Sequence, residues 1–249
     1  FTVNSIAIDV KTGKVLDPFN GLSDLKNKIL KATDASAFVD DALRIIRAIQ
    51  FASRFRFSIE PETLKMMKKN AHLLNEITGE RILMELDKIL LKNGSTRIAF
   101  ELLEKTDIDK VLFGKKFIHK DFSDFEGLDI VSFYYILGTF GSTSPSKFYK
   151  ERLKGEFHIT KALQTLDSYF GKFCDFAPGM KRTEAENKWN VFQMLKIAPS
   201  LKDARVLPEI AWKIIEEMKA GKIPMKMGDI PVSGNDIMDK FAVTGQEVG

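Results

Sequence analysis

The first residues of the chain alternate between apolar and polar positions, as expected for a strand with one buried face. The alternation runs over Thr2–Asp9, a turn follows at Thr12–Gly13, and a second short apolar stretch stands at Val15–Leu16. This spacing predicts a β-hairpin. A lone hairpin is only marginally stable in water. We therefore expect it to belong to a larger sheet whose other strands precede Phe1.

Beyond the hairpin the apolar positions recur at helical spacing. Ser23, Pro61, Thr78 and Ser95 stand where caps or first turns of helices are expected. The predicted helices cover residues 24–30, 37–54 and 61–70, others begin after residues 78 and 95, and residues 121–249 contain only helices. The predicted fold class is therefore mainly α, following a short β-hairpin.

The composition is that of a globular protein. The 249 residues are 44% hydrophobic and 29% charged, and the chain contains one cysteine and three histidines. These values exclude a disulfide framework and disfavour a His/Cys zinc site. The longest mostly apolar stretch, residues 130–140, is about half of what a membrane span needs. A single cysteine, Cys174, suits a reducing compartment, so we expect a cytoplasmic protein.

The positive charge is concentrated in one segment. The chain carries a net charge of +4, and residues 25–72 hold ten Lys or Arg against five Asp or Glu. Such a segment favours a polyanionic partner, either RNA or a nucleoside triphosphate. The alternative is a solvated helix face with no ligand.

Several well-known catalytic motifs are absent from the sequence. There is no phosphate-binding P-loop, no HExxH zinc helix and no GxSxG nucleophile elbow. Asp40 and Asp41 diverge by about 100° if they share a helix, which makes them a poor metal clamp. Asp107 and Asp109 follow a predicted helix and are typical of a loop or cap.

The helix predicted over residues 37–54 carries the most informative constellation. Asp41, Arg44 and Arg47 follow one another at intervals of three, so they are expected on one face, opposite the isoleucines. The simplest interpretation is a surface ion pair of little energetic value. The pair of Asp41 and Arg44 can also read a nucleobase. Ionised Asp only accepts hydrogen bonds and Arg only donates them.

Cytosine and adenine present ring acceptors beside an amino group, which matches these two side chains. Guanine and uracil present an N–H and a carbonyl at the same places. Each mismatched polar group costs roughly 1–3 kcal/mol. A fixed Asp-x-x-Arg therefore accepts C and A and rejects G and U.

Four segments resemble, in the right order, motifs of the bacterial-type (class II) family of tRNA CCA-adding enzymes and poly(A) polymerases, without most of its N-terminal catalytic head. They are Phe1–Ala7 (FTVNSIA), Asp17–Leu25 (DPFNGLSDL), Asp40–Phe51 (DDALRIIRAIQF) and Gly79–Leu90 (GERILMELDKIL). A fifth segment, Val232–Ile237, weakly resembles a stretch of the family's C-terminal region.

The resemblance implies a domain order. Residues 1–30 are expected to be the end of a nucleotidyltransferase head, 31–92 a helical neck that recognises the base, 93–200 a helical body, and 201–249 the start of an RNA-binding tail. The names neck and body are used below for these predicted segments.

The resemblance also implies an activity. The family transfers CMP or AMP from CTP or ATP to the 3′ end of tRNA, with Mg²⁺ held by head carboxylates upstream of this chain. Asp41 and Arg44 would read the base, Arg47 would contact the nucleotide or brace Arg44, and Asn4 would lie near the sugar and phosphates. Asp17 and Gly21 would belong to a flexible connection between head and neck. No residue of this chain is expected to be catalytic or to bind the metal.

Some features depart from the family pattern or leave alternatives open. Gln50 stands where the family usually has arginine, Asp40 replaces a glutamate, and no phosphohydrolase domain follows the neck. Activity as an A-adding enzyme or poly(A) polymerase fits the same motifs. A headless RNA-binding module and a protein-binding helical scaffold are the other readings. We expect this chain alone to be inactive.

Overall fold

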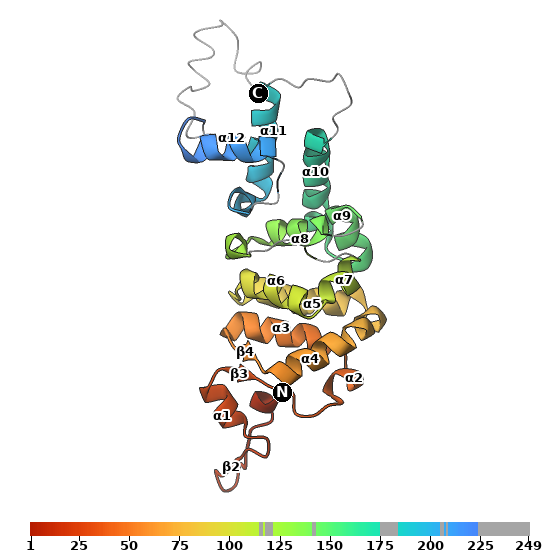
Figure 1. The fold of residues 1–249 in the computed structure, drawn as a ribbon, viewed down its shortest axis with the longest axis vertical. Coiled ribbons are helices and arrows are strands. Elements are labelled where there is room, and N and C mark those ends of the chain that lie inside the picture. The colour runs from red at the N-terminus through yellow and green to blue at the C-terminus, as the bar shows by residue number, and fades with distance from the viewer. Residues whose placement is uncertain are drawn as a thin grey trace, which may run out of the picture.

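The computed structural model describes residues 1–114, 117, 122–140, 143–174, 184–204, 207 and 209–223. The segment Val232–Ile237 and most of the predicted tail lie outside these residues. The described part is an elongated stack of helical layers, with the N-terminal hairpin at one end and α11 and α12 at the other (Figure 1). The predicted mainly α fold is confirmed.

The first part of the stack contains short helices that pack across one another. Its elements are η1 (Thr2–Asn4), α1 (Gly21–Lys26), α2 (Ala37–Asp40), α3 (Leu43–Phe55), α4 (Pro61–Asn70), η2 (Ala71–Glu76), α5 (Gly79–Leu91), α6 (Thr96–Lys105) and α7 (Ile108–Phe113). The predicted helix over residues 61–70 has these same limits, and Ser95 caps α6 by accepting the Ile98 N–H.

The second part continues the stack. Its elements are η3 (Ser123–Phe125), α8 (Ile130–Thr139), α9 (Pro145–Lys147), the π-helical turn η4 (Phe148–Arg152), α10 (Phe157–Cys174), α11 (Glu184–Ile197), η5 (Pro199–Lys202) and α12 (Glu209–Lys219). As predicted, the described elements after residue 121 are all helical. Among the described residues, no helix combines the length and the apolar character that would let it cross a bilayer.

Two pairs of very short strands complete the described fold. β1 (Ala7–Ile8) and β2 (Val15–Leu16) are antiparallel and form the predicted hairpin. The predicted strand from Thr2 is wrong in its first part, because residues 2–4 form a 3-10 turn. The parallel pair of β3 (Ile29–Leu30) and β4 (Ser58–Ile59) was not predicted. Side chains of β1 and β2 are exposed on both faces.

The predicted helix over residues 24–30 is shifted in the structure. The α1 helix begins at Gly21 because Asp17 caps it, its carboxylate accepting the N–H groups of Gly21 and Leu22 at 2.6 and 2.9 Å. Ser23 therefore lies inside the helix and not at its start. The chain then enters β3, which pairs with β4 and brings the end of the head segment onto the neck.

A continuous core runs through the stack from Leu30 to Met218. On α3 it is formed by Ile45, Ile46 and Ile49, which are fully buried. Between α6 and α8 it becomes aromatic, with the Phe100 ring centroid 4.8 Å from Phe125 and 5.5 Å from Phe133. Phe100, Phe125 and Phe133 are all fully buried here.

Neck and body meet where α5 passes η4 and α8. A Cβ added to Gly79 would overlap the carbonyl oxygen of Arg152, so the backbones touch here. Arg152 also donates from Nη2 to the Leu74 carbonyl oxygen at 3.2 Å. Further along α5, the Tyr134 hydroxyl donates to Asp87 at 2.5 Å. The joint is therefore held by a backbone contact and a buried polar one.

The backbone contact predicts that Gly79→Ala destabilises the protein. The added methyl group cannot fit without moving η4, and overpacking of this kind costs roughly 1–3 kcal/mol. Urea unfolding followed by circular dichroism measures the change. The neighbouring exposed residue gives the control, since Glu80→Ala adds no overlap. Unchanged stability of Gly79→Ala would show that the joint is loose.

The polar contact predicts a pH dependence. Burial raises the pKa of Asp87, partly opposed by the Tyr134 hydroxyl, and Glu156 raises it further. Because this pKa is higher in the folded than in the unfolded chain, the folded state is favoured as the pH falls through the raised value. Asp87→Asn keeps the acceptor but does not titrate.

We therefore expect the free energy of unfolding of the wild type, relative to Asp87→Asn, to rise as the pH is lowered from about 7 to about 4. Urea titrations at a series of pH values measure the difference. The exposed carboxylate of Asp203 offers a matched control, Asp203→Asn. A difference that is flat with pH, or that falls, contradicts the assignment.

Candidate nucleotide-recognition site

The helix predicted as continuous over residues 37–54 is interrupted at Asp41. α2 ends at Asp40, α3 begins at Leu43, and Asp41 between them is extended, with φ −153° and ψ 98°. Its Oδ1 atom accepts the Leu43 N–H at 3.2 Å. An aspartate that bonds a nearby backbone N–H offers the chain an alternative to helix continuation. The prediction of one long helix is wrong for this reason.

The break changes the geometry of the predicted pair. Asp41 and Arg44 are not i,i+3 neighbours on one helix, whereas Arg44 and Arg47 are both on α3, away from its buried isoleucines. Asp41 and Arg44 do not form the surface ion pair of the simplest interpretation, because each bonds to another group.

The guanidinium of Arg44 is anchored to α2. Its Nη1 atom donates to the carbonyl oxygen of Ala37 at 2.9 Å. Ala37 opens a helix of four residues, and its carbonyl would otherwise need another donor. The side chain of Arg44 is half-buried, and Nη2 and Nε have no partner among the described residues. Arginine has five N–H donors, so most of them remain available to a ligand.

The carboxylate of Asp41 is anchored to α5. Oδ1 lies 3.5 Å from Nη2 of Arg81, and 29% of the Asp41 side chain is exposed. Both contacts of this carboxylate use Oδ1, so Oδ2 has no partner within the described part of the chain. The side chain is thus held on one edge and open on the other.

Arg47 is held by the buried carboxylate of Glu85. Its Nη2 atom lies 3.3 Å from Oε1 of Glu85, and Lys88 lies 2.9 Å from the same oxygen. The side chain of Glu85 is 4% exposed and that of Arg47 is 42% exposed. A buried carboxylate needs such partners. The Nη2 side of the Arg47 guanidinium is therefore held by Glu85, and the rest of the side chain is exposed.

The charged residues of α5 pair both within that helix and with other elements. Glu85 and Lys88 are paired within α5. Arg81 and Glu85 also reach back to Asp41 and to Arg47 of α3, which the helical pattern did not predict. A signal for Glu85 was present, because it shares the buried stripe of Ile82, Leu86 and Ile89, where an unpaired carboxylate is too costly.

The motif residues of the head segment pack against this site. The Phe1 ring lies 6.3 Å from Phe38 and 6.1 Å from Phe51, measured between centroids. These contacts fix the start of the chain on α2 and α3. Asn4 ends η1 and is exposed, which leaves its amide free to meet solvent or a ligand.

The segment Asp17–Leu25 is an ordered element in the structure. Thr2 donates from Oγ1 to Asp24 at 2.7 Å, and a Cβ at Gly21 would overlap the Thr2 carbonyl oxygen. Asp17 caps α1 as described above. The connection at Asp17 and Gly21, expected to be flexible, is packed against η1, and Asp17 and Asp24 both have structural partners.

Gln50 and the acidic residues considered above as metal ligands have other surroundings. Gln50, which replaces the usual arginine, is 2% exposed and belongs to the interior. Within the residues that the structure describes, no three His, Cys, Asp or Glu side chains are grouped so that they could hold a metal ion. Asp109 is fully buried and accepts the N–H groups of Lys110 and Phe117, which is a structural role.

Two protein families match parts of the chain. The family described as poly A polymerase head domain matches residues 1–31. The family described as a probable RNA and SrmB-binding site of polymerase A matches residues 56–120. The matched ranges include the head segment and most of the neck.

Curated relatives also match part of the chain. The CCA-adding enzyme of Streptococcus uberis is 50% identical over 93 residues, which are 36% of this chain and 23% of that enzyme. The CCA-adding enzyme of Ligilactobacillus salivarius is 41% identical over 133 residues, or 50% of this chain and 32% of that enzyme. The match therefore spans 23% to 32% of the length of these relatives.

Solved structures share the fold over the whole chain. The Thermotoga maritima CCA-adding enzyme complexed with tRNA is 21% identical with a TM-score of 0.64, and the match covers 100% of this chain and 65% of that enzyme. The Bacillus stearothermophilus CCA-adding enzyme in complex with CTP is 23% identical with a TM-score of 0.58, covering 100% of this chain and 64% of that enzyme.

The head segment, the neck with its anchored aspartate and arginines, and the helical layers that follow thus agree with the motif order, the matched families and the shared fold. The chain is similar to the class II family of CCA-adding enzymes and poly(A) polymerases over its head segment and most of its neck.

Proposed function

We propose that the complete protein adds CMP and AMP from CTP and ATP to the 3′ end of tRNA, and that this chain recognises the base and binds the RNA. One observation carries the proposal. At the bend between α2 and α3, Oδ2 of Asp41 and the outer N–H groups of Arg44 have no partner among the described residues, while both side chains are anchored. The relatives named above are CCA-adding enzymes.

The anchored pair offers the complement of two bases. Asp41 accepts a hydrogen bond from the exocyclic amino group of cytosine or adenine, and Arg44 donates a hydrogen bond to a ring acceptor of the same base. Guanine and uracil place a carbonyl against Asp41 and an N–H against Arg44, which leaves polar groups unpaired. Each such mismatch costs roughly 1–3 kcal/mol. Selection of C and A thus needs no nucleic-acid template.

Arg47 and Asn4 complete the proposed nucleotide site. Arg47 turns an exposed guanidinium outward from its ion pair with Glu85, and guanidinium groups bind phosphate oxygens well. Asn4 lies exposed on the head segment, where its amide is proposed to meet the sugar or phosphates.

Other parts of the proposal rest on the family likeness. The division into head segment (1–30), neck (31–92), body (93–200) and tail (201–249) is kept. Phosphoryl transfer needs Mg²⁺ to stabilise the leaving group, and in this proposal the ions are held by head carboxylates that precede Phe1. The proposed cellular location is the cytoplasm.

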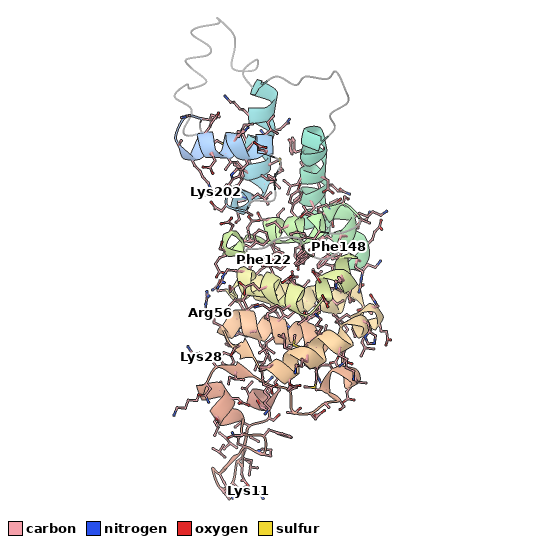
Figure 2. All side chains as sticks on the ribbon, viewed as in Figure 1. Lys11, Lys28, Arg56, Phe122, Phe148 and Lys202 are labelled. Atoms are coloured by element: carbon pink, nitrogen blue, oxygen red, sulfur yellow. The ribbon has the colours of Figure 1, made fainter. Side chains whose placement is uncertain are left out.

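Exposed basic side chains support RNA binding. Figure 2 shows Lys28 and Arg56 on the same edge of the stack. Both residues are exposed, and Arg56 is paired with Glu126 at 3.2 Å. The edge lies beside β3 and β4, where the segment richest in positive charge folds together. Phosphate contacts of this kind make affinity depend strongly on salt.

The complete protein tests the proposed reaction. Incubated with tRNA that lacks its 3′ end, it is expected to add C, C and A, which sequencing of the product reads directly. Addition of A alone would assign an A-adding enzyme or poly(A) polymerase. The 249-residue chain by itself is expected to add nothing but to bind tRNA with a steep salt dependence. Addition of nucleotides by this chain alone would contradict the proposal that catalysis requires the head carboxylates.

Base reading by the bend predicts the behaviour of Arg44→Ala in the complete protein. Loss of the ring donor should lower kcat/KM for both CTP and ATP by roughly ten- to a hundredfold and weaken discrimination against UTP. Steady-state kinetics with each of the three triphosphates measures both effects.

Arg54→Ala is the matched control, because Arg54 is an exposed arginine on the same helix and lies over the Phe55 ring. It should leave selectivity unchanged. If Arg44→Ala lost activity but kept its full preference against UTP, Arg44 would serve only to hold α2.

A further inference from the structure

A cavity of about 280 Å³ lies in the predicted body, away from the bend between α2 and α3. Its apolar floor consists of Leu112, Phe113 and Phe148, and the Phe113 and Phe148 rings lie 4.7 Å apart between centroids. Its rim carries Lys147, Glu151 and Arg152. A small apolar chamber with a few polar groups at the mouth is the usual form of a ligand site.

One wall of the cavity has an unusual backbone. The η4 turn is π-helical, and the Leu153 N–H donates to the Phe148 carbonyl oxygen, five residues back, at 3.3 Å. π-Helices make up well under 1% of residues in globular proteins and often occur at functional sites. The wide turn places Phe148 on the floor and Arg152 on the rim, and the Gly79 backbone buttresses it from behind.

The cations on the rim are not neutralised by neighbours. Arg152 is half-buried, and its one hydrogen bond in the described part of the chain goes to the Leu74 carbonyl oxygen. Burial lowers the pKa of Arg152. Lys147 is exposed, and no acidic group pairs with it among the described residues.

We propose that this cavity binds a single nucleotide unit, with the base on the apolar floor and the phosphate on Lys147 and Arg152. The volume is at the lower limit for ligand pockets, which suits one base and excludes a whole triphosphate. Glu151 stands on the same rim as an acceptor, so bases with an exocyclic amino group are favoured over uracil. This inference rests on the proposed RNA-directed function.

The nucleotide unit has two chemically equivalent sources, a free nucleotide or an unpaired nucleotide of bound RNA. An extruded base held by aromatic and arginine side chains is a common mode of RNA recognition. The probes are therefore CMP, UMP, inorganic phosphate and a short oligocytidine. Methyl NMR of Leu112 reports on the cavity, and the methyl group of Met84, three residues after Arg81, reports on the neck.

CMP and oligocytidine are expected to shift the Leu112 signals, CMP at lower concentration than UMP or phosphate. A stronger response to oligocytidine than to CMP identifies RNA as the source. Lys147→Met should weaken the response to CMP roughly tenfold, which is about 1.4 kcal/mol. Thr143→Trp, which places a large ring at another exposed lining residue, should abolish the response.

Lys150→Met is the matched control, because Lys150 is exposed on the same turn but does not line the cavity. Equal weakening by Lys147→Met and Lys150→Met, or no shift of Leu112 with any probe, overturns the proposal. The Met84 signals separate this outcome from failure of the neck site. If Met84 responds and Leu112 does not, only the cavity proposal is contradicted. If Leu112 responds and Met84 does not, only the proposed neck function is contradicted.

Discussion

The buried carboxylate of Glu85 is the interaction on which the nucleotide-recognition site depends. It sits in the apolar stripe of α5 and is neutralised by Arg47 from α3 and by Lys88. Without these cations the carboxylate would be a buried charge with no partner, which proteins avoid. Glu85 therefore fixes both the packing of α3 on α5 and the direction of Arg47. A purely apolar contact would fix the packing alone.

Close backbone approach explains why some motif positions are glycine. Gly21 lets the Thr2 carbonyl come against α1, and Gly79 lets η4 come against α5. In both places a Cβ would collide with backbone, which cannot swing away as a side chain can. Gly21 thus allows close packing within the head segment, and Gly79 allows it between neck and body. Their place in the motifs follows from packing and requires no contact with a ligand.

The sequence predicted the helices with clear caps and the core, but not the bend. Pro61 and Ser95 are local start signals, and the structure confirms a helix that begins at Pro61 and one that is capped by Ser95. The break at Asp41 depends on a local bond from the Leu43 N–H and on the distant Arg81 across the site, and helical periodicity carries no information about either. The same limit applies to the pairing of β3 with β4, because each strand is only two residues long and its partner lies 29 residues away in sequence.

The bend makes the proposed base recognition more plausible than the continuous helix would have. On a single helix, Asp41 and Arg44 at i,i+3 would satisfy each other, and a base would have to break their ion pair before binding. In the structure the Ala37 carbonyl and Arg81 take one edge of each side chain and keep the two apart. The remaining edges are already oriented and unpaired within the described chain. Less conformational freedom is then lost on binding, and that is the condition under which two side chains can discriminate between bases.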